Sequence, residues 1–246
     1  MKAMIFAAGL GTRLRPLTDN RPKALVEVAG VPMLERVIEN LKCYGFTDIV
    51  INVHHFGEQI IDFVESHNRF GINIAISDER NELLDTGGGI LHARQLLDDG
   101  EPFLVHNADI LTDLDLRKLY NQHVESQADA TLLVAERTTS RYLLFDNNQT
   151  LRGWENIKTG EIRPEGISTA DLRPRAFGGI HVISPSIFDA LQGYSDQHKF
   201  SITPFYVDCC NRLHIKGFTP SEHYHWFDIG KLETLQLAQQ AIADRQ

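Results

Sequence analysis

The residues best suited to chemistry lie within positions 4–23, where an apolar run meets glycines and then cations. Gly9 and Gly11 follow the apolar run directly, and Arg13 and Lys23 come after them. Glycine lets backbone amides approach a ligand closely, and successive exposed amides form a concavity suited to anions. Two prolines restrict the backbone ahead of Lys23. The pattern therefore predicts an anion-binding loop at the end of a buried strand, with one lysine held beside it.

Asp109 is a second candidate, because it comes directly after the apolar stretch 103–106. The carboxyl ends of parallel strands meet at one edge of a sheet, so we expect Asp109 at the same edge as Gly11. The alternative is a structural aspartate in a turn or at a helix start. Asp113 and Asp115 fit that structural role better, as caps for a helix that begins at residue 116.

Strands and helices are predicted to alternate over the first half of the chain. Apolar and β-branched runs predict strands over 4–8, 49–53, 72–76 and 103–106, and helical spacing predicts helices over 33–44, 57–67 and 90–97. Such alternation is typical of a parallel sheet covered by helices on both faces. From residue 129 onward hairpins replace the helical crossovers, with strands predicted over 130–135, 142–145, 151–154, 176–183 and 225–230 and a final helix over 232–242. The polar stretch 159–175 is predicted to be a surface insertion.

The composition of the 246-residue chain is that of a globular protein, with 42% hydrophobic and 23% charged residues. A formal net charge of −9 argues against a surface for nucleic acid. The three cysteines, Cys43, Cys209 and Cys210, show neither a disulfide framework nor metal-ligand spacing. The apolar start is too short to span a membrane. We therefore expect a cytoplasmic protein, a monomer or homodimer, without nucleic-acid or membrane partners.

The loop resembles that of the sugar-1-phosphate nucleotidyltransferases, which reads G-x-G-T/S-R-x-x-P-x-T-x-x-x-P-K. The matching positions are Gly9, Gly11, Thr12, Arg13, Pro16, Thr18, Pro22 and Lys23. Ala24 stands where the family usually has a further proline. The run 107–109 and the run 226–230 match two more family motifs, although Lys231 replaces the usual threonine.

This resemblance implies a three-layer α/β/α, Rossmann-like fold of the GT-A type with a mostly parallel central sheet. It also implies a single domain over residues 1–246. Residues 1–125 would form its nucleotide-binding half, and residues 126–246 its sugar-phosphate-binding half.

The resemblance further implies roles for particular residues. Asp109 and Asp228 would bind magnesium (Mg²⁺), the expected cofactor. Arg13 and Lys23 would be catalytic, because they would neutralise the phosphates as charge develops on the leaving pyrophosphate. The implied nucleotide-binding residues are Ala7, Ala8, Gly9, Gly11, Thr12, Arg13, Asp85, Gly87 and Gly88. Those implied for the sugar phosphate are Asn107, Glu155, Gly178 and Gly179.

The glycine-rich stretch 84–89 would lie against the base, which its backbone groups would read. Alternatively, it is simply the flexible start of a helix. The family often has Glu-Lys-Pro near Glu155, but Asn156 follows it here.

The implied reaction joins a nucleoside triphosphate to a sugar 1-phosphate and releases pyrophosphate, as in the synthesis of cell-wall or polysaccharide precursors. The stretch 85–90 looks most like that of uridylyltransferases acting on N-acetylmuramate 1-phosphate or a related hexose 1-phosphate. One alternative is a guanylyltransferase for mannose 1-phosphate or heptose 1-phosphate. Another is a cytidylyltransferase for phosphocholine-like substrates. A relative that senses nucleotide sugars without catalysing a reaction would be expected to have lost Lys23 or one of the aspartates. This chain keeps Lys23, Asp109 and Asp228.

Overall fold

The computed structural model describes residues 1–244, in which strands and helices alternate as far as residue 126. The strands are β1 (Lys2–Phe6), β2 (Glu27–Val28), β3 (Val31–Pro32), β4 (Asp48–Val53), β5 (Asn73–Asp78), β6 (Phe103–Asn107), β7 (Ile110–Thr112), β8 (Ala130–Ala135), β9 (Arg141–Phe145), β10 (Leu151–Asn156), β11 (Glu161–Arg163), β12 (Arg173–Ile183), β13 (Ile215–Phe218) and β14 (Trp226–Asp228). The α-helices are α1 (Met33–Cys43), α2 (Gly57–Ser66), α3 (Asp85–His92), α4 (Arg94–Leu97), α5 (Leu116–Ser126), α6 (Ile187–Gln192), α7 (Ile202–Cys209) and α8 (Leu232–Ala243). Short 3-10 turns are η1 (Thr12–Leu14), η2 (Lys23–Leu25) and η3 (Asn68–Gly71).

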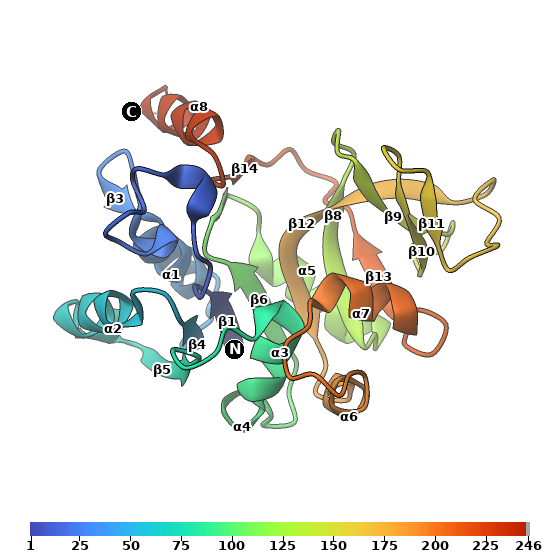
Figure 1. The fold of residues 1–246 in the computed structure, drawn as a ribbon, viewed down its shortest axis with the longest axis horizontal. Helices are drawn as coiled ribbons and strands as arrows, with labels where there is room; N and C mark the ends of the chain where they lie inside the picture. The colour runs from blue at the N-terminus through green and yellow to red at the C-terminus, as the bar shows by residue number, and fades with distance from the viewer. Residues whose placement is uncertain (245–246) are drawn as a thin grey trace.

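A ten-stranded mixed sheet forms the centre of the molecule (Figure 1). Its main path runs β11-β10-β9-β12-β6-β1-β4-β5, and β8 and β13 join it beside β12. Strands β5, β4, β1 and β6 are parallel, whereas β12 is antiparallel to β6. The long strand β12 pairs with β9 near its start and with β6 near its end. It therefore connects the parallel half of the sheet to the antiparallel strands β9 to β11, which we call the β9–β11 wing.

Alternate side chains of the central strands enter two separate cores. Ala3 and Ile5 of β1 belong to one cluster, which also holds apolar residues of α1, α2 and α5. Met4 belongs to the other, with residues of α3, α6 and α7. Because successive strand residues face opposite sides, this division shows a sheet covered by helices on both faces. The predicted α/β class with a largely parallel central sheet is confirmed.

Several elements differ from their predicted form. The predicted helix 90–97 starts earlier, so the three glycines lie inside α3, and it breaks at Ala93 before α4. The predicted last strand is only β14, which pairs with β7 in a small ribbon outside the main sheet. The predicted surface insertion contains β11 and the start of β12. Asp115 caps α5 as predicted, accepting hydrogen bonds from the amides of Arg117 and Lys118.

A third, smaller core joins α8 to the segment that follows β1. It contains Leu14, Val26, Ile229, Leu235 and Ala238. Within residues 1–244, no helix is both long enough and apolar enough to cross a membrane.

Candidate active site

The glycine-rich loop turns at Gly11, whose φ of +67° lies in the left-handed region that favours glycine. A Cβ at this position would come within 3.0 Å of both Lys23 Cβ and Thr18 Cγ2. The Thr18 hydroxyl donates a 2.8 Å hydrogen bond to the Gly11 carbonyl. The loop is thus folded tightly against the segment that carries Lys23. Thr12 and Arg13 follow in the turn η1.

Asn52, at the carboxyl end of β4, binds the backbone just before this loop. Its Oδ1 accepts hydrogen bonds from the amides of Ala7 and Ala8, at 2.8 and 3.3 Å. These two amides therefore support the strand end and are not open to a nucleotide, contrary to a role as backbone donors. The described residues offer no hydrogen-bond partner to the amides of Gly9, Leu10 and Gly11, so these three can face an anion.

Glu79 completes this support from the end of β5. Its carboxylate accepts hydrogen bonds from Asn52 Nδ2 at 2.8 Å and from the Leu84 amide at 3.3 Å. Burial raises the pKa of Glu79, and these two hydrogen bonds oppose the rise. A Cβ on Gly89 would lie 2.8 Å from Glu79 Oε1, so this glycine makes room for the carboxyl group.

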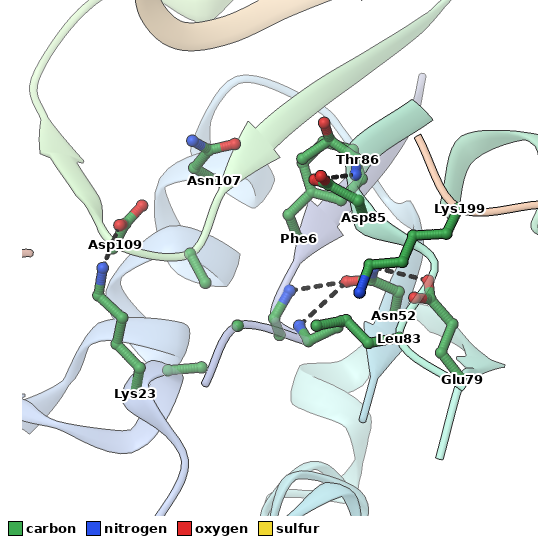
Figure 2. A pocket seen from close by; sticks show the side chains of 15 residues that line it. Phe6, Lys23, Asn52, Glu79, Leu83, Asp85, Thr86, Asn107, Asp109 and Lys199 are labelled. Carbon is green, nitrogen blue, oxygen red and sulfur yellow. Dashed lines mark hydrogen bonds and ion pairs between the residues drawn. The ribbon is translucent and has the colours of Figure 1, made fainter. Parts of the chain in front are cut away.

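The two predicted metal ligands, Asp109 and Asp228, come together across the β7–β14 ribbon. The Ile229 amide donates a 2.8 Å hydrogen bond to the Asp109 carbonyl, and Asp228 lies opposite Ile110 in the ribbon. The Lys23 ammonium group forms an ion pair with the Asp109 carboxylate (Figure 2).

Asp228 has an unusual environment for a carboxylate. Its Oδ1 is buried, with no hydrogen-bond partner among residues 1–244. Burial, followed by the negative charge of Asp109, raises the pKa of Asp228, while Lys23, Arg13 and Arg137 act in the opposite direction. Two converging carboxylates, one with an unpartnered oxygen, fit a hard divalent cation that completes its shell with phosphate oxygens and water. The described residues contain no group of three or more His, Cys, Asp or Glu side chains suited to a metal.

A cavity of about 440 Å³ extends from this cluster along the carboxyl ends of the strands. Figure 2 shows Lys23 and Asp109 on one side of it and Asn52, Glu79 and Lys199 on the other. The predicted residues that line it are Ala7, Ala8, Gly9, Lys23, Asp85, Asn107 and Asp109. Thr86, which belongs to the stretch predicted to lie against the base, also lines it, and lining residues that sequence reasoning missed include Phe6, Asn52, Glu79, Leu83 and Lys199. Asn52 and Glu79 could have been found from their places at predicted strand ends, whereas Lys199 comes from the segment between α6 and α7, where no pattern indicated a site.

Gly87 and Gly88 do not line this cavity, because they pack against the segment 198–200. Both amides donate to the Phe200 carbonyl, at 2.9 and 3.1 Å. A Cβ on Gly88 would overlap the His198 carbonyl oxygen, and one on Gly87 would overlap the Phe200 ring. The amides of Gly87 and Gly88 and the space beside their Cα atoms are taken up by this packing, and their role in binding the base stays a prediction.

On the sugar-phosphate side, three of the four predicted residues gather near the two aspartates. Gly179 has a φ of +73°, and a Cβ there would lie 2.9 Å from Asn107 Nδ2. The Gly178 carbonyl accepts a 2.8 Å hydrogen bond from Trp226 Nε1, two residues before Asp228.

Glu155 is not brought into this group. Its neighbours on β10, Trp154 and Asn156, line a second cavity. Alternation along the strand directs Glu155 to the opposite face. The register shift between Leu151 and Gly153 determines which side chains of β10 face each side of the sheet, and the sequence does not reveal this shift.

The chain matches known proteins along nearly its whole length. The family model for nucleotidyl transferases matches residues 2–245. The chain is 38% identical to an N-acetylmuramate alpha-1-phosphate uridylyltransferase of Neisseria meningitidis over 79% of this chain and 80% of that protein. It is 31% identical to the enzyme of the same name from Caulobacter vibrioides, over 98% and 97% of the two chains.

Solved structures show a similar fold. HddC from Yersinia pseudotuberculosis, in its complex with GMP-PN, has a TM-score of 0.75 at 24% identity, covering 98% of this chain and 99% of that one. A UDP-glucose pyrophosphorylase has a TM-score of 0.78 at 18% identity, covering 100% and 99%. With the loop, the lysine and the paired aspartates in place, the chain belongs to the nucleotidyl transferase family.

Proposed function

We propose that this sugar-1-phosphate nucleotidyltransferase joins UTP to N-acetylmuramate 1-phosphate, or to a related hexose 1-phosphate, with release of pyrophosphate. The observation that carries the reaction is the convergence of Lys23, Asp109 and Asp228 beside the glycine-rich loop. The names of the two bacterial relatives favour the substrates. The product would be a cell-wall or polysaccharide precursor made in the cytoplasm by a monomer or homodimer.

The chemistry needs charge neutralisation more than proton transfer, because a sugar 1-phosphate is already an anionic nucleophile. Its oxygen attacks the α-phosphorus of the nucleotide, and the bond to the pyrophosphate leaving group breaks. The free amides of Gly9 to Gly11, together with Arg13, would hold the β- and γ-phosphates. Lys23 would stabilise charge at the α-phosphate.

Asp109 and Asp228 would hold Mg²⁺, which when bound neutralises phosphate charge and orients the reacting groups. Asp109 lines the nucleotide cavity, and Trp226, two residues before Asp228, donates to the Gly178 carbonyl; both observations support this assignment. Residues 1–125 would bind the nucleotide and residues 126–246 the sugar phosphate.

The base would occupy the end of the cavity that lies away from Lys23 and Asp109 (Figure 2). Asn52, Glu79, Asp85 and Lys199 line this cavity. The Asp85 carboxylate already accepts a 2.7 Å hydrogen bond from the Thr86 amide. After this bond the carboxylate still has free acceptor sites, so Asp85 is also able to accept from the N1–H and amino group of guanine, and the choice of uracil rests on the names of the two bacterial relatives.

The test is pyrophosphate release across a matrix of nucleoside triphosphates and sugar 1-phosphates, with kcat/KM compared for UTP and GTP. We expect a preference for UTP that survives in Asp85→Ala. A preference for GTP that collapses in this variant would reassign the base and make Asp85 its reader. The guanylyl alternative has its own support, since a mannose-1-phosphate guanyltransferase of Schizosaccharomyces pombe is 31% identical over 94% of this chain and 61% of that protein.

A further inference from the structure

A second cavity, of about 580 Å³, lies between the β9–β11 wing and α7. Arg137, Arg141 and Arg163 line it together with the aromatic side chains of Trp154 and Phe177. We call it the arginine cavity. None of its three arginines belongs to the machinery assigned above to phosphate or metal.

The charges in the arginine cavity are not balanced. Glu161 is the only acidic residue among those described at its wall, and it forms a 2.6 Å ion pair with Arg163. Within residues 1–244, the Arg141 side chain has no hydrogen-bond or ion-pair partner. Arg137 donates to the Phe177 carbonyl and stacks 4.1 Å from the centre of the Trp226 ring, without a carboxylate hydrogen-bonded to it. In a chain with a net charge of −9, this concentration of positive charge is a local feature.

The arginine cavity adjoins the reaction centre on one side and the nucleotide cavity on another. On one side Arg137 covers Trp226, two residues before Asp228, and its charge acts on that carboxylate. On the other side the wall includes Ser201, whose Oγ lies 3.4 Å from Thr86 Oγ1 at the nucleotide cavity. A sugar whose 1-phosphate sits at Asp109 and Asp228 can therefore extend into the arginine cavity.

We propose that the arginine cavity binds a carboxylate carried by the sugar, with Arg141 and Arg163 as the residues that determine this specificity. The inference rests on the proposed function, whose sugar class it names. Guanidinium groups present planar, paired donors that match a carboxylate, and charge-assisted bonds of this kind are among the strongest. A neutral sugar offers hydroxyl groups instead, and it would leave Arg141 without an anionic partner.

The test compares two pairs of sugar 1-phosphates that differ in a carboxylate. The first pair is N-acetylmuramate 1-phosphate and N-acetylglucosamine 1-phosphate, and the second is glucuronate 1-phosphate and glucose 1-phosphate. We expect the wild type to favour the acidic member of at least one pair. Arg141→Gln and Arg163→Gln should each lower kcat/KM for that acidic sugar about tenfold or more. The same variants should change kcat/KM for the neutral member of the pair by less than about twofold. Arg173→Gln, at an exposed arginine of β12 outside the cavity, is the matched control and should change neither value.

The outcomes separate this inference from the proposed function. Equal use of acidic and neutral sugars, unchanged in both variants, would overturn the carboxylate site while leaving nucleotidyl transfer intact. Failure to release pyrophosphate with any substrate pair would instead refute the proposed function. Calorimetric titration with N-acetylmuramate 1-phosphate and with glucuronate 1-phosphate, without nucleotide, would then decide the inference. Weaker binding in Arg141→Gln and Arg163→Gln supports the inference, and no binding, or equal binding by wild type and variants, overturns it.

Discussion

Replacing Gly88 by alanine tests whether the glycines of α3 serve packing or the base. The new Cβ would overlap the His198 carbonyl, which is backbone and cannot rotate away. The segment 198–200 must then separate from α3, with loss of the hydrogen bonds from the Gly87 and Gly88 amides to Phe200, from Phe200 to Leu84, and from Ile202 to Thr86.

At a net contribution of about 1 kcal/mol for each hydrogen bond, losing this docking should cost roughly 3–4 kcal/mol. Alanine recovers up to about 1 kcal/mol through its helix propensity. The expected net loss in the free energy of unfolding is therefore about 2–3 kcal/mol, because packing outweighs propensity at this site.

The measurement is urea unfolding of the wild type, Gly88→Ala and Gly9→Ala, with KM for the nucleotide determined in parallel. Gly9 is the matched control, because a Cβ there meets nothing within 4 Å. We expect Gly9→Ala to leave the free energy of unfolding within about 0.5 kcal/mol of the wild-type value. If Gly88→Ala is as stable as the wild type but raises KM for the nucleotide, the packing explanation is wrong and the glycine faces the base.

Three further predictions concern the metal site and the buried histidines. Asp109→Asn and Asp228→Asn should each lower kcat by a few orders of magnitude, about 3–5 kcal/mol of barrier, with an unchanged circular dichroism spectrum; retention of a tenth of the activity would remove that residue from the site. EDTA should abolish turnover and Mg²⁺, but not Zn²⁺, should restore it, so full activity in chelator would exclude the assignment. Stability should fall between pH 6.5 and pH 4, because burial lowers the pKa of His106 and His123 to about 4 and that of His181 to about 3. In this range the histidines take up protons in the unfolded chain but not in the folded one, which lowers the free energy of unfolding by roughly 3 kcal/mol for each histidine at pH 4. Urea unfolding that gives the same free energy of unfolding at pH 7 and pH 4.5 would contradict the burial argument.

Features that depend on nearby residues could be predicted from the sequence. The turn at Gly11 needs a residue that tolerates positive φ, and its contacts with Thr18 and Lys23 are made within one short segment. The helices α1 and α2 follow from apolar spacing, and the alternation of strands and helices indicates the layers. The position of Asp109 at a strand end follows from the same alternation.

Features that depend on distant contacts could not be predicted. A run of glycines suits either a loop or a helix. Here the glycines lie in α3, where the amides of Gly87 and Gly88 donate to the carbonyl of Phe200, a residue far along the chain. From the sequence, the amides of Ala7 and Ala8 are predicted to bind a ligand, but in the structure both donate to Asn52 Oδ1. One register shift in β10 decides which face Glu155 occupies, since a single extra residue reverses every later side chain.

The residue after Asp228 packs beside the glycine-rich loop. Ile229 follows Asp228 directly, and its amide is bonded to the backbone of Asp109. Its side chain shares the third core with Leu14 of η1 and with Leu235 of α8. Asp228 and the glycine-rich loop, which come from near opposite ends of the chain, are therefore linked through one small packed unit. Because packed apolar contacts resist deformation, we expect a shift of α8 to displace Asp228 and the loop together, so the spacing between the proposed phosphate and metal sites would depend on this core as well as on the central sheet.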